Sequence, residues 1–338
     1  MNILAVESSC DETAVAIVVD GRKVLTDQIA SQVELHRTYG GVVPEIASRK
    51  HIEAIYALAD QALEAAQITR SDIDAVAVTY APGLIGAVLV GVNFAKAVAM
   101  AMNKPLIPVH HIRGHIAANY IAYPELKPPF LCLVVSGGHT MFVDVKDYTD
   151  MEILGGTLDD AAGECFDKVA RVLGMPYPGG AALDKAAKEG DESKYQLPRA
   201  KAGTNPYDMS FSGLKTAALN LIHHADQVGE TLDIPSLCAA FSGAVSDTLV
   251  PRAMAAMEQT GYRKLAVAGG VAANSRIRAD LTAAAEKLGA TVYMPPLSLC
   301  GDNAAMIGAQ AYYEYQAGNI ADMSLNAYAT KSILGEKL

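Results

Sequence analysis

The chain has 338 residues, of which 51% are hydrophobic and 19% charged, and a formal net charge of −10 at pH 7. This length exceeds what one hydrophobic core usually organises, so we expect two packed domains. The acidic balance argues against a general affinity for nucleic acid but is compatible with a local basic patch. Five scattered cysteines without a C-x-x-C motif argue against a disulfide framework and against structural zinc.

The chain opens with a strand–turn–strand pattern. Apolar residues 3–8 and 14–19 flank the polar turn "SCDET", which predicts a hairpin. Residues 45–66 are expected to be helical, and the helix expected at 83–102 is apolar almost all round, which predicts burial. The chain has no run of 18 or more uncharged apolar residues, and its first residues lead to acidic side chains without a basic segment. We therefore expect a cytoplasmic protein that does not enter a membrane.

Three histidines follow the strand expected at 106–109, in the segment "HHIRGH". His111 and His115 are four residues apart, so on a helix both imidazoles project from one face and can hold a metal ion. Two imidazoles, a carboxylate and open coordination positions suit Fe(II) or Zn(II). Ile112 stands where the H-E-x-x-H motif of metalloproteases has its catalytic glutamate, so we do not expect a metalloprotease.

The strand–turn–strand pattern recurs at 130–145, around the turn "SGGHT". This repeat predicts two related α/β halves, each beginning with a hairpin and continuing with alternating strands and helices. A proline-rich segment at 124–130 interrupts the helical pattern. It predicts a boundary between domains 1–125 and 126–338.

Several glycines and aspartates have both a functional and a structural interpretation. The turn "SGGHT" suits a phosphate cradle or an ordinary tight hairpin turn, and by itself favours the second. Gly269 and Gly270 join an expected strand to a helix expected from about Ala273, which suits a nucleotide phosphate but is also what a strand-to-helix turn requires. Asp11 fits an Asx turn and Asp302 a helix N-cap, unless they serve the chemistry. The chain has no Walker A motif.

Nine segments occur in uninterrupted order between residue 1 and about residue 318: "VESSCDETAVAIV", "SQVELHRTYGGVVPEIASRKH", "YAPGLIGAVLVGVNFAKAVA", "PVHHIRGHI", "LVVSGGHT", "DDAAGECFDKVARVLGMPYPGG", "SFSGLKTA", "AGGVAANSRIR" and "CGDNAAMI". Together they resemble the bacterial TsaD family, once called glycoprotease or Gcp, whose members are tRNA N6-adenosine threonylcarbamoyltransferases. The resemblance implies the fold of actin, sugar kinases and heat-shock ATPases (ASKHA), with two related α/β domains and a cleft between them. This fold agrees with the repeat.

The resemblance also implies a metal site. His111, His115 and Asp302 would be the ligands of one divalent ion, with Fe(II) preferred and Zn(II) as the alternative. His110 belongs to the same motif, and we expect it to support the metal shell through a hydrogen bond.

The substrate residues are implied in the same way. Asp11 and Glu12 would face the reacting centre, and we favour Asp11 as the acceptor of the amine proton. The resemblance places substrate contacts at nine residues of the second half: Val134, Val135, Ser136, Gly137, Gly138, Asp167, Gly180, Asp184 and Asn274.

The implied reaction transfers a threonylcarbamoyl group from threonylcarbamoyl-adenylate to the exocyclic amine of an adenosine in tRNA, releasing AMP. The adenosine lies 3′ to the anticodon of tRNAs that read ANN codons. The implied partners are a TsaB-like paralogous subunit, which would form a heterodimer with this chain, and a TsaE-like ATPase. For the contact with tRNA we consider a basic patch with these residues: Arg49, Lys50, Arg113, Arg199 and Lys201.

Three other functions fit parts of the pattern. A sugar kinase on the same fold needs turnover of Mg-ATP, which an ATPase assay with candidate sugars detects. An antibiotic-type O-carbamoyltransferase carries a large additional domain, for which 338 residues leave no room. A non-catalytic scaffold similar to the family's shorter partner lacks the histidine pair that this chain has.

Overall fold

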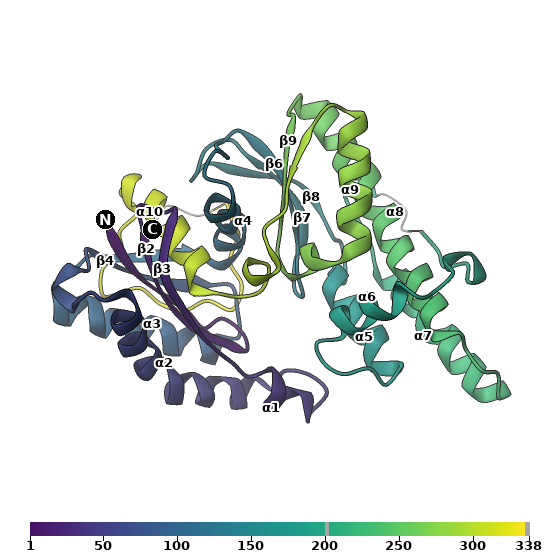
Figure 1. The fold of residues 1–338 in the computed structure, drawn as a ribbon, viewed down its shortest axis with the longest axis horizontal. Helices are drawn as coiled ribbons and strands as arrows, with labels where there is room; N and C mark the ends of the chain where they lie inside the picture. Colours follow the sequence, from purple (N-terminus) through teal and green to yellow (C-terminus); the bar gives the residue numbers. More distant parts are fainter. Residues whose placement is uncertain (200–202, 335–338) are drawn as a thin grey trace. The chain divides into compact units, whose positions relative to one another are not determined.

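The computed structural model describes residues 1–199 and 203–334 (Figure 1). By their contacts these residues form two compact units. The first unit consists of three segments: Met1–Pro128, Lys146–Met151 and the described part of Pro295–Leu338. The second unit consists of two: Pro129–Val145 and Glu152–Met294.

These units differ from the expected division into 1–125 and 126–338, because Lys146–Met151 and the C-terminal segment belong to the first unit. The segment after α10 (Ala304–Gln316) packs on the first unit, with Leu325 and Ile333 buried. The amide of Tyr328 donates to the carbonyl of Tyr80 over 2.9 Å. A linear boundary cannot show such a return, because it depends on contacts between residues that are far apart in the chain.

The first unit is built on a five-stranded sheet with the order β3-β2-β1-β4-β5. The strands β3, β2 and β1 are antiparallel to their neighbours, whereas β1, β4 and β5 run parallel. Their bounds are Asn2–Glu7 (β1), Glu12–Val19 (β2), Lys23–Ser31 (β3), Ala75–Ala81 (β4) and Leu106–His110 (β5). The hairpin predicted at the start of the chain is therefore confirmed.

The second unit repeats this order, because its sheet reads β8-β7-β6-β9-β10 from the other end. Strands β6 and β7 form an antiparallel hairpin, and β6, β9 and β10 run parallel. Their bounds are Phe130–Val135 (β6), Thr140–Val145 (β7), Met151–Gly156 (β8), Lys264–Ala268 (β9) and Thr291–Tyr293 (β10). The repeat of two hairpin-led α/β halves is confirmed.

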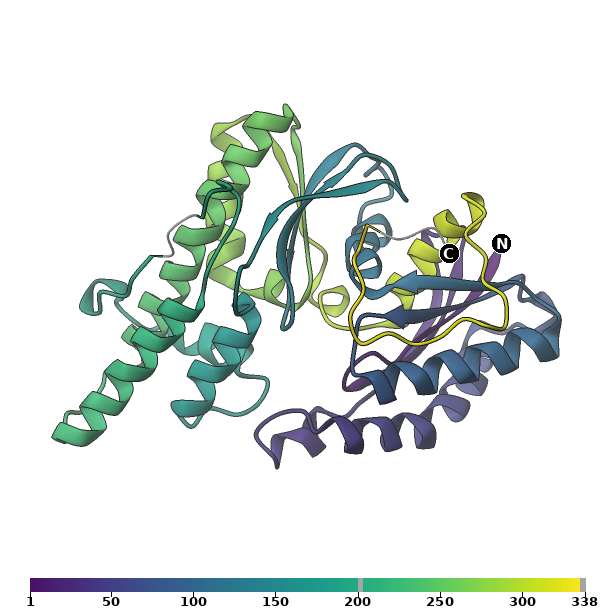
Figure 2. The ribbon, with the colours of Figure 1, turned by 180° about the vertical axis from the view of Figure 1, so that it is seen from behind.

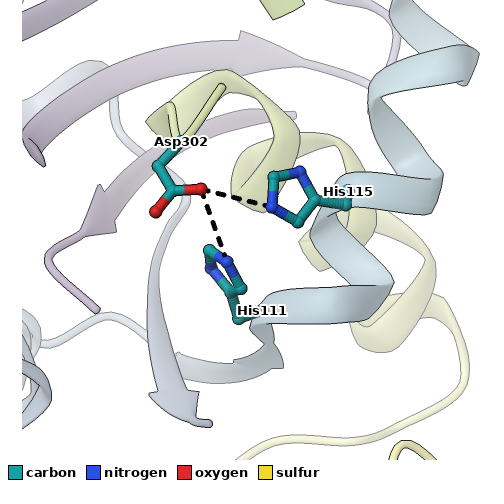
Figure 3. A group of neighbouring side chains, drawn as sticks. All are labelled: His111, His115 and Asp302. Carbon is teal, nitrogen blue, oxygen red and sulfur yellow. Dashed lines mark ion pairs between the residues drawn. The ribbon is translucent and has the colours of Figure 1, made fainter. Parts of the chain in front are cut away.

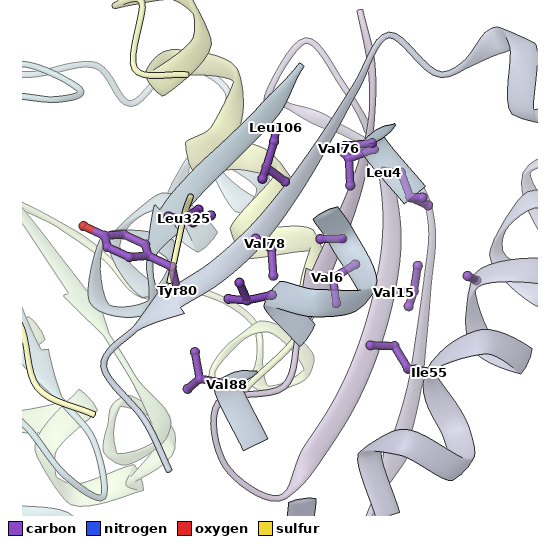
Figure 4. Packing of buried hydrophobic residues seen from close by; sticks show 14 of the residues in the cluster. Leu4, Val6, Val15, Ile55, Val76, Val78, Tyr80, Val88, Leu106 and Leu325 are labelled. Atoms are coloured by element: carbon purple, nitrogen blue, oxygen red, sulfur yellow. The ribbon is translucent and has the colours of Figure 1, made fainter. Parts of the chain in front are cut away.

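Helices cover both faces of the first sheet (Figures 1 and 2). Leu4 and Val6 of β1 face a cluster with α2 and α3, whereas Ile3 and Ala5 face α4 and α10. This alternation follows from the two-residue period of a strand. Figure 4 shows the packing of the α2 and α3 side. The helices of this unit are α1 (Val33–Arg37), α2 (Pro44–Ala66), α3 (Ile85–Met102), α4 (His111–Ala122) and α10, with short 3-10 turns η1 (Arg70–Asp72) and η4 (Leu297–Leu299).

The second unit has its own set of helices. Among them α8 contacts β6, and α9 contacts both α8 and β10. Their bounds are α5 (Ala162–Val172), α6 (Gly179–Ala187), α7 (Ser212–Val228), α8 (Ile234–Thr260) and α9 (Ser275–Lys287), with 3-10 turns η2 (Glu192–Lys194) and η3 (Gly270–Ala273). The helix expected from about Ala273 thus begins at Ser275, after a 3-10 turn.

The prediction that the apolar helix at 83–102 is buried all round was wrong. Helix α3 buries one face, through small residues such as Ala87 and Ala95, while Ile85 and Met100 are exposed. In the described part of the chain it is the one helix long and apolar enough to cross a membrane. The buried face of α3 packs on the first sheet and on α2.

Candidate active site

The functional residues of the first unit gather where its parallel strands end. β1 ends at Glu7, β4 at Ala81 and β5 at His110. Because parallel strands end at one edge of a sheet, these positions are neighbours, and this edge is where α/β proteins commonly bind ligands. Helix α4 begins at His111, directly after β5, so the sheet itself places the first histidine of the pair.

His110 caps the helix that carries the histidine pair. Its Nδ1 accepts from the amide of Ile112 over 3.3 Å, which caps the N-terminus of α4. Its Nε2 lies 3.1 Å from the carbonyl of Lys331 and donates to it. His110 therefore links the start of the histidine helix to the C-terminal segment of the first unit.

His111, His115 and Asp302 lie together (Figure 3). Oδ1 of Asp302 is 3.5 Å from Nε2 of His111 and 3.2 Å from Nε2 of His115. The imidazole centroids are 4.6 Å apart and the ring planes 78° from parallel. Both histidines are buried and Asp302 is partly exposed, so the group opens on the side of the carboxylate.

This arrangement fits a metal ion. One ligand atom of each side chain lies within 4.8 Å of the others. Ligands about 2.1 Å from a tetrahedral ion are about 3.4 Å apart, close to the two nitrogen–oxygen distances. Two imidazole nitrogens and one carboxylate oxygen are the donors that Fe(II) and Zn(II) accept, and three protein ligands leave coordination positions for a substrate.

Close packing of α10 against α4 brings Asp302 to the histidines. A Cβ atom on Gly114, between the two histidines, would lie 2.7 Å from Cδ1 of Ile307 on α10, so a glycine here permits the approach. The N-cap interpretation of Asp302 was wrong, because the side chain of Asn303 accepts from the amide of Met306 over 2.8 Å and caps α10. Asp302 is thus not needed as the cap.

Two carboxylates that the sequence did not single out support this group. Glu7 is fully buried, and its Oε2 lies 3.0 Å from Nδ1 of His111. Asp27 on β3 accepts from the amide of Ala304 over 3.3 Å, which holds the start of α10 near Asp302. Burial raises the pKa of Asp27 to about 6, although the backbone amides that it accepts from oppose the increase. In the sequence, Glu7 and Asp27 appear only as ordinary acidic residues, the first within an expected strand.

Asp302 and Glu7 raise the pKa of His111. Burial by itself lowers the pKa of this imidazole, but the negative charges of Asp302 and Glu7 and the hydrogen bond to Glu7 outweigh burial and raise it to about 9. In the metal-free chain a proton therefore occupies the position between His111 and Asp302. Metal binding must displace that proton, as it does wherever a metal ligand is protonated beforehand.

Asp11 ends the turn between β1 and β2, and Glu12 is the first residue of β2. The carbonyl of Asp11 accepts from the amide of Gln32 over 3.0 Å, and Oε1 of Glu12 accepts from the hydroxyl of Ser31 over 2.9 Å. Burial raises the pKa of Glu12 to about 9, with further contributions from the charges of Asp11 and Asp302. The turn is thus within electrostatic range of the metal group.

His51, on α2, holds the same turn from behind. Its Nε2 is 3.0 Å from the carbonyl of Cys10 and must donate to it, so Nδ1 accepts from the hydroxyl of Thr13 over 2.7 Å. The ring is fully buried, and burial lowers its pKa. A neutral imidazole therefore fixes the backbone beside Asp11 and Glu12, a role that the sequence pattern did not reveal.

In the second unit the predicted phosphate cradle is a tight hairpin turn. The amide of Ser136 donates to the carbonyl of His139 over 2.8 Å, and Gly137 and Gly138 form the exposed tip. A Cβ atom on either glycine would meet no atom within 4 Å. The preceding Val134 and Val135 are fully buried in β6, and their contact with a substrate stays a prediction.

Other chain segments lie against this turn. The amide of Gly163, at the start of α5, donates to the carbonyl of Ser136 over 3.2 Å. Gly269, which follows β9, has φ +95°, and a Cβ atom there would lie 2.6 Å from the carbonyl oxygen of Val135. The turn after β6, the start of α5 and the glycine turn after β9 therefore meet at the carboxyl ends of parallel strands.

The remaining predicted substrate residues of this unit join helix ends. Oδ1 of Asp167 accepts from the amides of Gly179 and Gly180 over 2.8 and 3.1 Å, at the start of α6. Oδ1 of Asp184 accepts from the amide and hydroxyl of Ser275 over 3.0 and 2.9 Å, and Asn274 caps α9 through the amide of Ile277. Asp167, Asp184 and Asn274 therefore stabilise the starts of helices α6 and α9. Their contact with a substrate stays a prediction.

The hypothesis of a basic patch is wrong for one of its residues. Arg113 is buried in α4 and pairs with Glu314 of α10 over 2.9 Å, and its Nε donates to the carbonyl of Ile333. Arg199 pairs with Asp247, and Lys201 lies outside the described residues.

Comparison with solved structures shows the class of the fold. Full-length HypF has a TM-score of 0.60 at 15% identity, with 98% of this chain and 47% of that chain covered. Component A of the (R)-2-hydroxyglutaryl-CoA dehydratase of Acidaminococcus fermentans has a TM-score of 0.56 at 15% identity, with 94% and 99% covered. With the repeated sheet order, this shows that the protein has the fold of actin, sugar kinases and heat-shock ATPases.

Sequence comparison identifies the family within this class. The family model of TsaD, tRNA N6-adenosine threonylcarbamoyltransferase, matches residues 23–309. An enzyme of that name from Clostridium botulinum (strain Kyoto / Type A2) is 52% identical over 337 residues, 100% of this chain and 99% of the relative. Another from Moorella thermoacetica is 55% identical over 326 residues, 96% and 95% of the two chains. The chain belongs to the TsaD family and is a tRNA-modifying transferase.

Proposed function

We propose that the threonylcarbamoyl donor is threonylcarbamoyl-adenylate and that the acceptor is the adenosine 3′ to the anticodon in tRNAs that read ANN codons. The acceptor's exocyclic nitrogen attacks the carbamoyl carbonyl carbon. The bond between that carbon and the phosphate oxygen breaks, AMP leaves, and the proton of the amine passes to a carboxylate. The donor is already activated, so the protein has mainly to orient the reactants and to stabilise developing charge.

The observation that carries this proposal is the group of His111, His115 and Asp302 beside the turn with Asp11 and Glu12 in the first unit. We assign the three residues as ligands of one divalent ion, Fe(II) in preference to Zn(II). When bound, the ion would supply Lewis-acid polarisation of a carbonyl oxygen. Metal analysis of the purified protein tests the identity of the ion.

We assign the adenylate to the loops of the second unit. The exposed Gly137–Gly138 tip offers backbone amides with open space beside them, as an approaching phosphate requires. Asp167, Asp184 and Asn274 hold the helix ends around these loops. In this assignment the three residues position the backbone around the nucleotide, in addition to any contact that they make with it.

We assign Asp11 as the acceptor of the amine proton. Glu12 is the weaker candidate because its raised pKa leaves it protonated at neutral pH in the metal-free chain. Asp11 is buried in a turn that Gln32 and His51 hold through backbone carbonyls, so its carboxylate is preorganised. We further propose a cytoplasmic location and a requirement for a TsaB-like subunit and a TsaE-like ATPase.

Single-turnover transfer from preformed adenylate to tRNA, with the partners present, tests the reaction and the role of Asp11. Mass spectrometry of the tRNA nucleosides should show threonylcarbamoyladenosine at the proposed position. Asp11→Asn keeps the shape but removes the base, so the transfer rate should fall by roughly 10²-fold or more. Binding of metal and AMP should change little.

Asp20→Asn is the matched control, because Asp20 lies exposed at the other end of the same hairpin. This variant should catalyse transfer at the wild-type rate. A near wild-type rate for Asp11→Asn would make Glu12 the better candidate for the acceptor of the amine proton. Loss of AMP binding as well would make Asp11 a substrate-positioning residue. Absence of the modified nucleoside with wild-type protein and partners would overturn the proposed reaction.

A further inference from the structure

We propose that Glu7 is a positioning residue that holds His111 in the tautomer and orientation required for metal binding through Nε2. This inference rests on the proposed metal site and concerns a residue outside the ligand set. Oε2 of Glu7 lies 3.0 Å from Nδ1 of His111, on the side of the ring opposite to the nitrogen that faces Asp302. A carboxylate in this place is the usual outer partner of a metal-binding imidazole.

The surroundings of Glu7 leave its carboxylate little freedom. The residue ends β1, which lies between β2 and β4, and it is fully buried. Oε1 accepts from the amide of Ser9 over 2.5 Å, and Oε2 accepts from the hydroxyl of Thr79 over 2.6 Å. Both oxygens are therefore held by the central strands of the sheet, and His111 contacts a carboxylate that is already fixed.

This fixed carboxylate determines which nitrogen of His111 carries hydrogen. An ionised carboxylate only accepts hydrogen bonds, so Nδ1 of His111 must donate. The neutral imidazole then has its lone pair on Nε2, which points to Asp302. The hydroxyl of Ser9 is also 3.2 Å from Nδ1, and its oxygen can accept from the same hydrogen. Glu7 thereby leaves Nε2 available to a cation.

The two histidines differ in this respect. Nδ1 of His115 is buried and has no hydrogen-bond partner within the part of the chain that the structure describes. No comparable contact sets the tautomer of His115, so the site depends on Glu7 for one of its two imidazoles. We expect the loss of Glu7 to affect His111 specifically.

Glu7→Gln reverses the hydrogen-bond pattern without changing the volume. Glutamine has one acceptor oxygen, which the amide of Ser9 requires, so its NH₂ group faces Thr79 and His111. The hydroxyl of Thr79 can rotate to accept from it. His111 accepts only with the lone pair on Nδ1, which places hydrogen on Nε2 and opposes metal binding.

The matched control is Glu314→Gln. Glu314 is also a buried carboxylate that accepts three hydrogen bonds, from Arg113, Gln310 and Asn319. It is tied to α4 through Arg113 but is not among the contacts of His111. Loss of this carboxylate should lower the stability of the first unit and leave metal affinity unchanged, so it separates positioning from general destabilisation.

The experiment measures Zn²⁺ affinity of the full chain by competition with a chromophoric chelator, alongside urea unfolding of the metal-free proteins. Glu7→Gln should bind Zn²⁺ about 10- to 100-fold more weakly than wild type, as loss of such an outer partner typically does. Glu314→Gln should match wild type, and His115→Ala should lose the ion. Wild-type affinity in Glu7→Gln, with loss in His115→Ala, would overturn the positioning role alone. Retention of the ion by His115→Ala would instead overturn the proposed metal site.

A measurement on the wild-type protein decides the question if Glu7→Gln does not fold. In the Zn²⁺-loaded protein with ¹⁵N-labelled histidine, long-range proton–nitrogen spectra report the tautomer of each ring. His111 should carry hydrogen on Nδ1 and bind the ion through Nε2. Metal binding through Nδ1 of His111 would contradict the proposal directly.

Discussion

Carboxyl groups dominate the electrostatics of the candidate metal site. The charges of Asp11 and Asp302 both raise the pKa of Glu12, and Asp302 also acts on the buried Glu7. A concentration of negative charge in a buried place is unfavourable unless a cation offsets it. A bound divalent ion would lower the pKa of Glu12 again, since it would be the largest local charge. The protonation of Glu12 is therefore linked to metal binding.

Glu12→Gln should stabilise the metal-free protein at alkaline pH. The pKa of Glu12 is about 9 in the folded chain and 4.5 as its ordinary value. Between these values the unfolded chain has lost the proton that the folded chain keeps, so wild-type stability decreases as the pH rises. Glutamine cannot ionise and removes this loss. The melting temperature of the variant should exceed that of wild type by a margin that grows from about pH 6 to about pH 9.

Thermal unfolding in the presence of a chelator measures this margin. Glu64→Gln is the control, because Glu64 is exposed on α2. Its melting temperature should equal that of wild type at every pH. A margin for Glu12→Gln that stays constant with pH would show that the glutamate is already ionised in the folded chain.

At the scale of elements, the two glycine turns of the second unit have different purposes. The Gly137–Gly138 tip is open and exposed. Gly269, by contrast, has φ +95° and lies against the backbone of Val135. A side chain is tolerated sterically at the first turn and strained at the second. Substitutions at these turns therefore separate a ligand-binding glycine from a structural one.

Gly137→Val should weaken AMP binding with little effect on stability. Valine covers the approach to the backbone, and loss of one hydrogen bond to a charged phosphate costs about 1.5–3 kcal/mol, roughly 10- to 100-fold in affinity. Gly269→Ala should instead destabilise the chain by about 1–3 kcal/mol, because it forces a backbone conformation suited to glycine. Calorimetric titration with AMP and urea unfolding measure both effects, and Zn²⁺ affinity should stay at the wild-type value in Gly137→Val. AMP affinity that is unchanged in Gly137→Val would assign the hairpin tip a structural role only.

At the scale of the whole molecule, the proposed metal ligands and the proposed nucleotide residues belong to different compact units. His111, His115 and Asp302 are in the first unit, and the residues assigned to the adenylate are in the second. A ligand stabilises the part of a protein that binds it, by about 2.7 kcal/mol at a concentration 100 times its Kd. The two ligands should therefore protect different peptides from hydrogen exchange.

Zn²⁺ should slow exchange mainly in α4 and at the start of α10. AMP should slow it mainly in the β6–β7 turn, in α5 and α6, and at the start of α9. Hydrogen exchange measured by mass spectrometry on the full chain, with each ligand alone, tests this pattern. Protection of α4 by AMP alone, or of the β6–β7 turn by Zn²⁺ alone, would contradict the assignment of the sites to separate units.

Local patterns in the sequence determined much of this protein. Apolar runs on either side of a short polar turn predicted both hairpins, and the recurrence of this pattern predicted two related halves, because these features depend on residues close in the chain. The spacing of His111 and His115 predicted that they share a helix face, for the same reason. Asp302 as their partner came from resemblance to a family, because spacing cannot relate residues so far apart.

The tertiary structure decided what depends on distant contacts. It assigned the C-terminal segment to the first unit, exposed one face of α3, made Asn303 the cap of α10 and buried Arg113 against Glu314. It also placed Glu7 behind His111 and His51 behind the turn of Asp11. In the sequence these appear as ordinary acidic and polar residues. Their roles arise only when packing removes water and leaves each buried polar atom to find a partner within the fold.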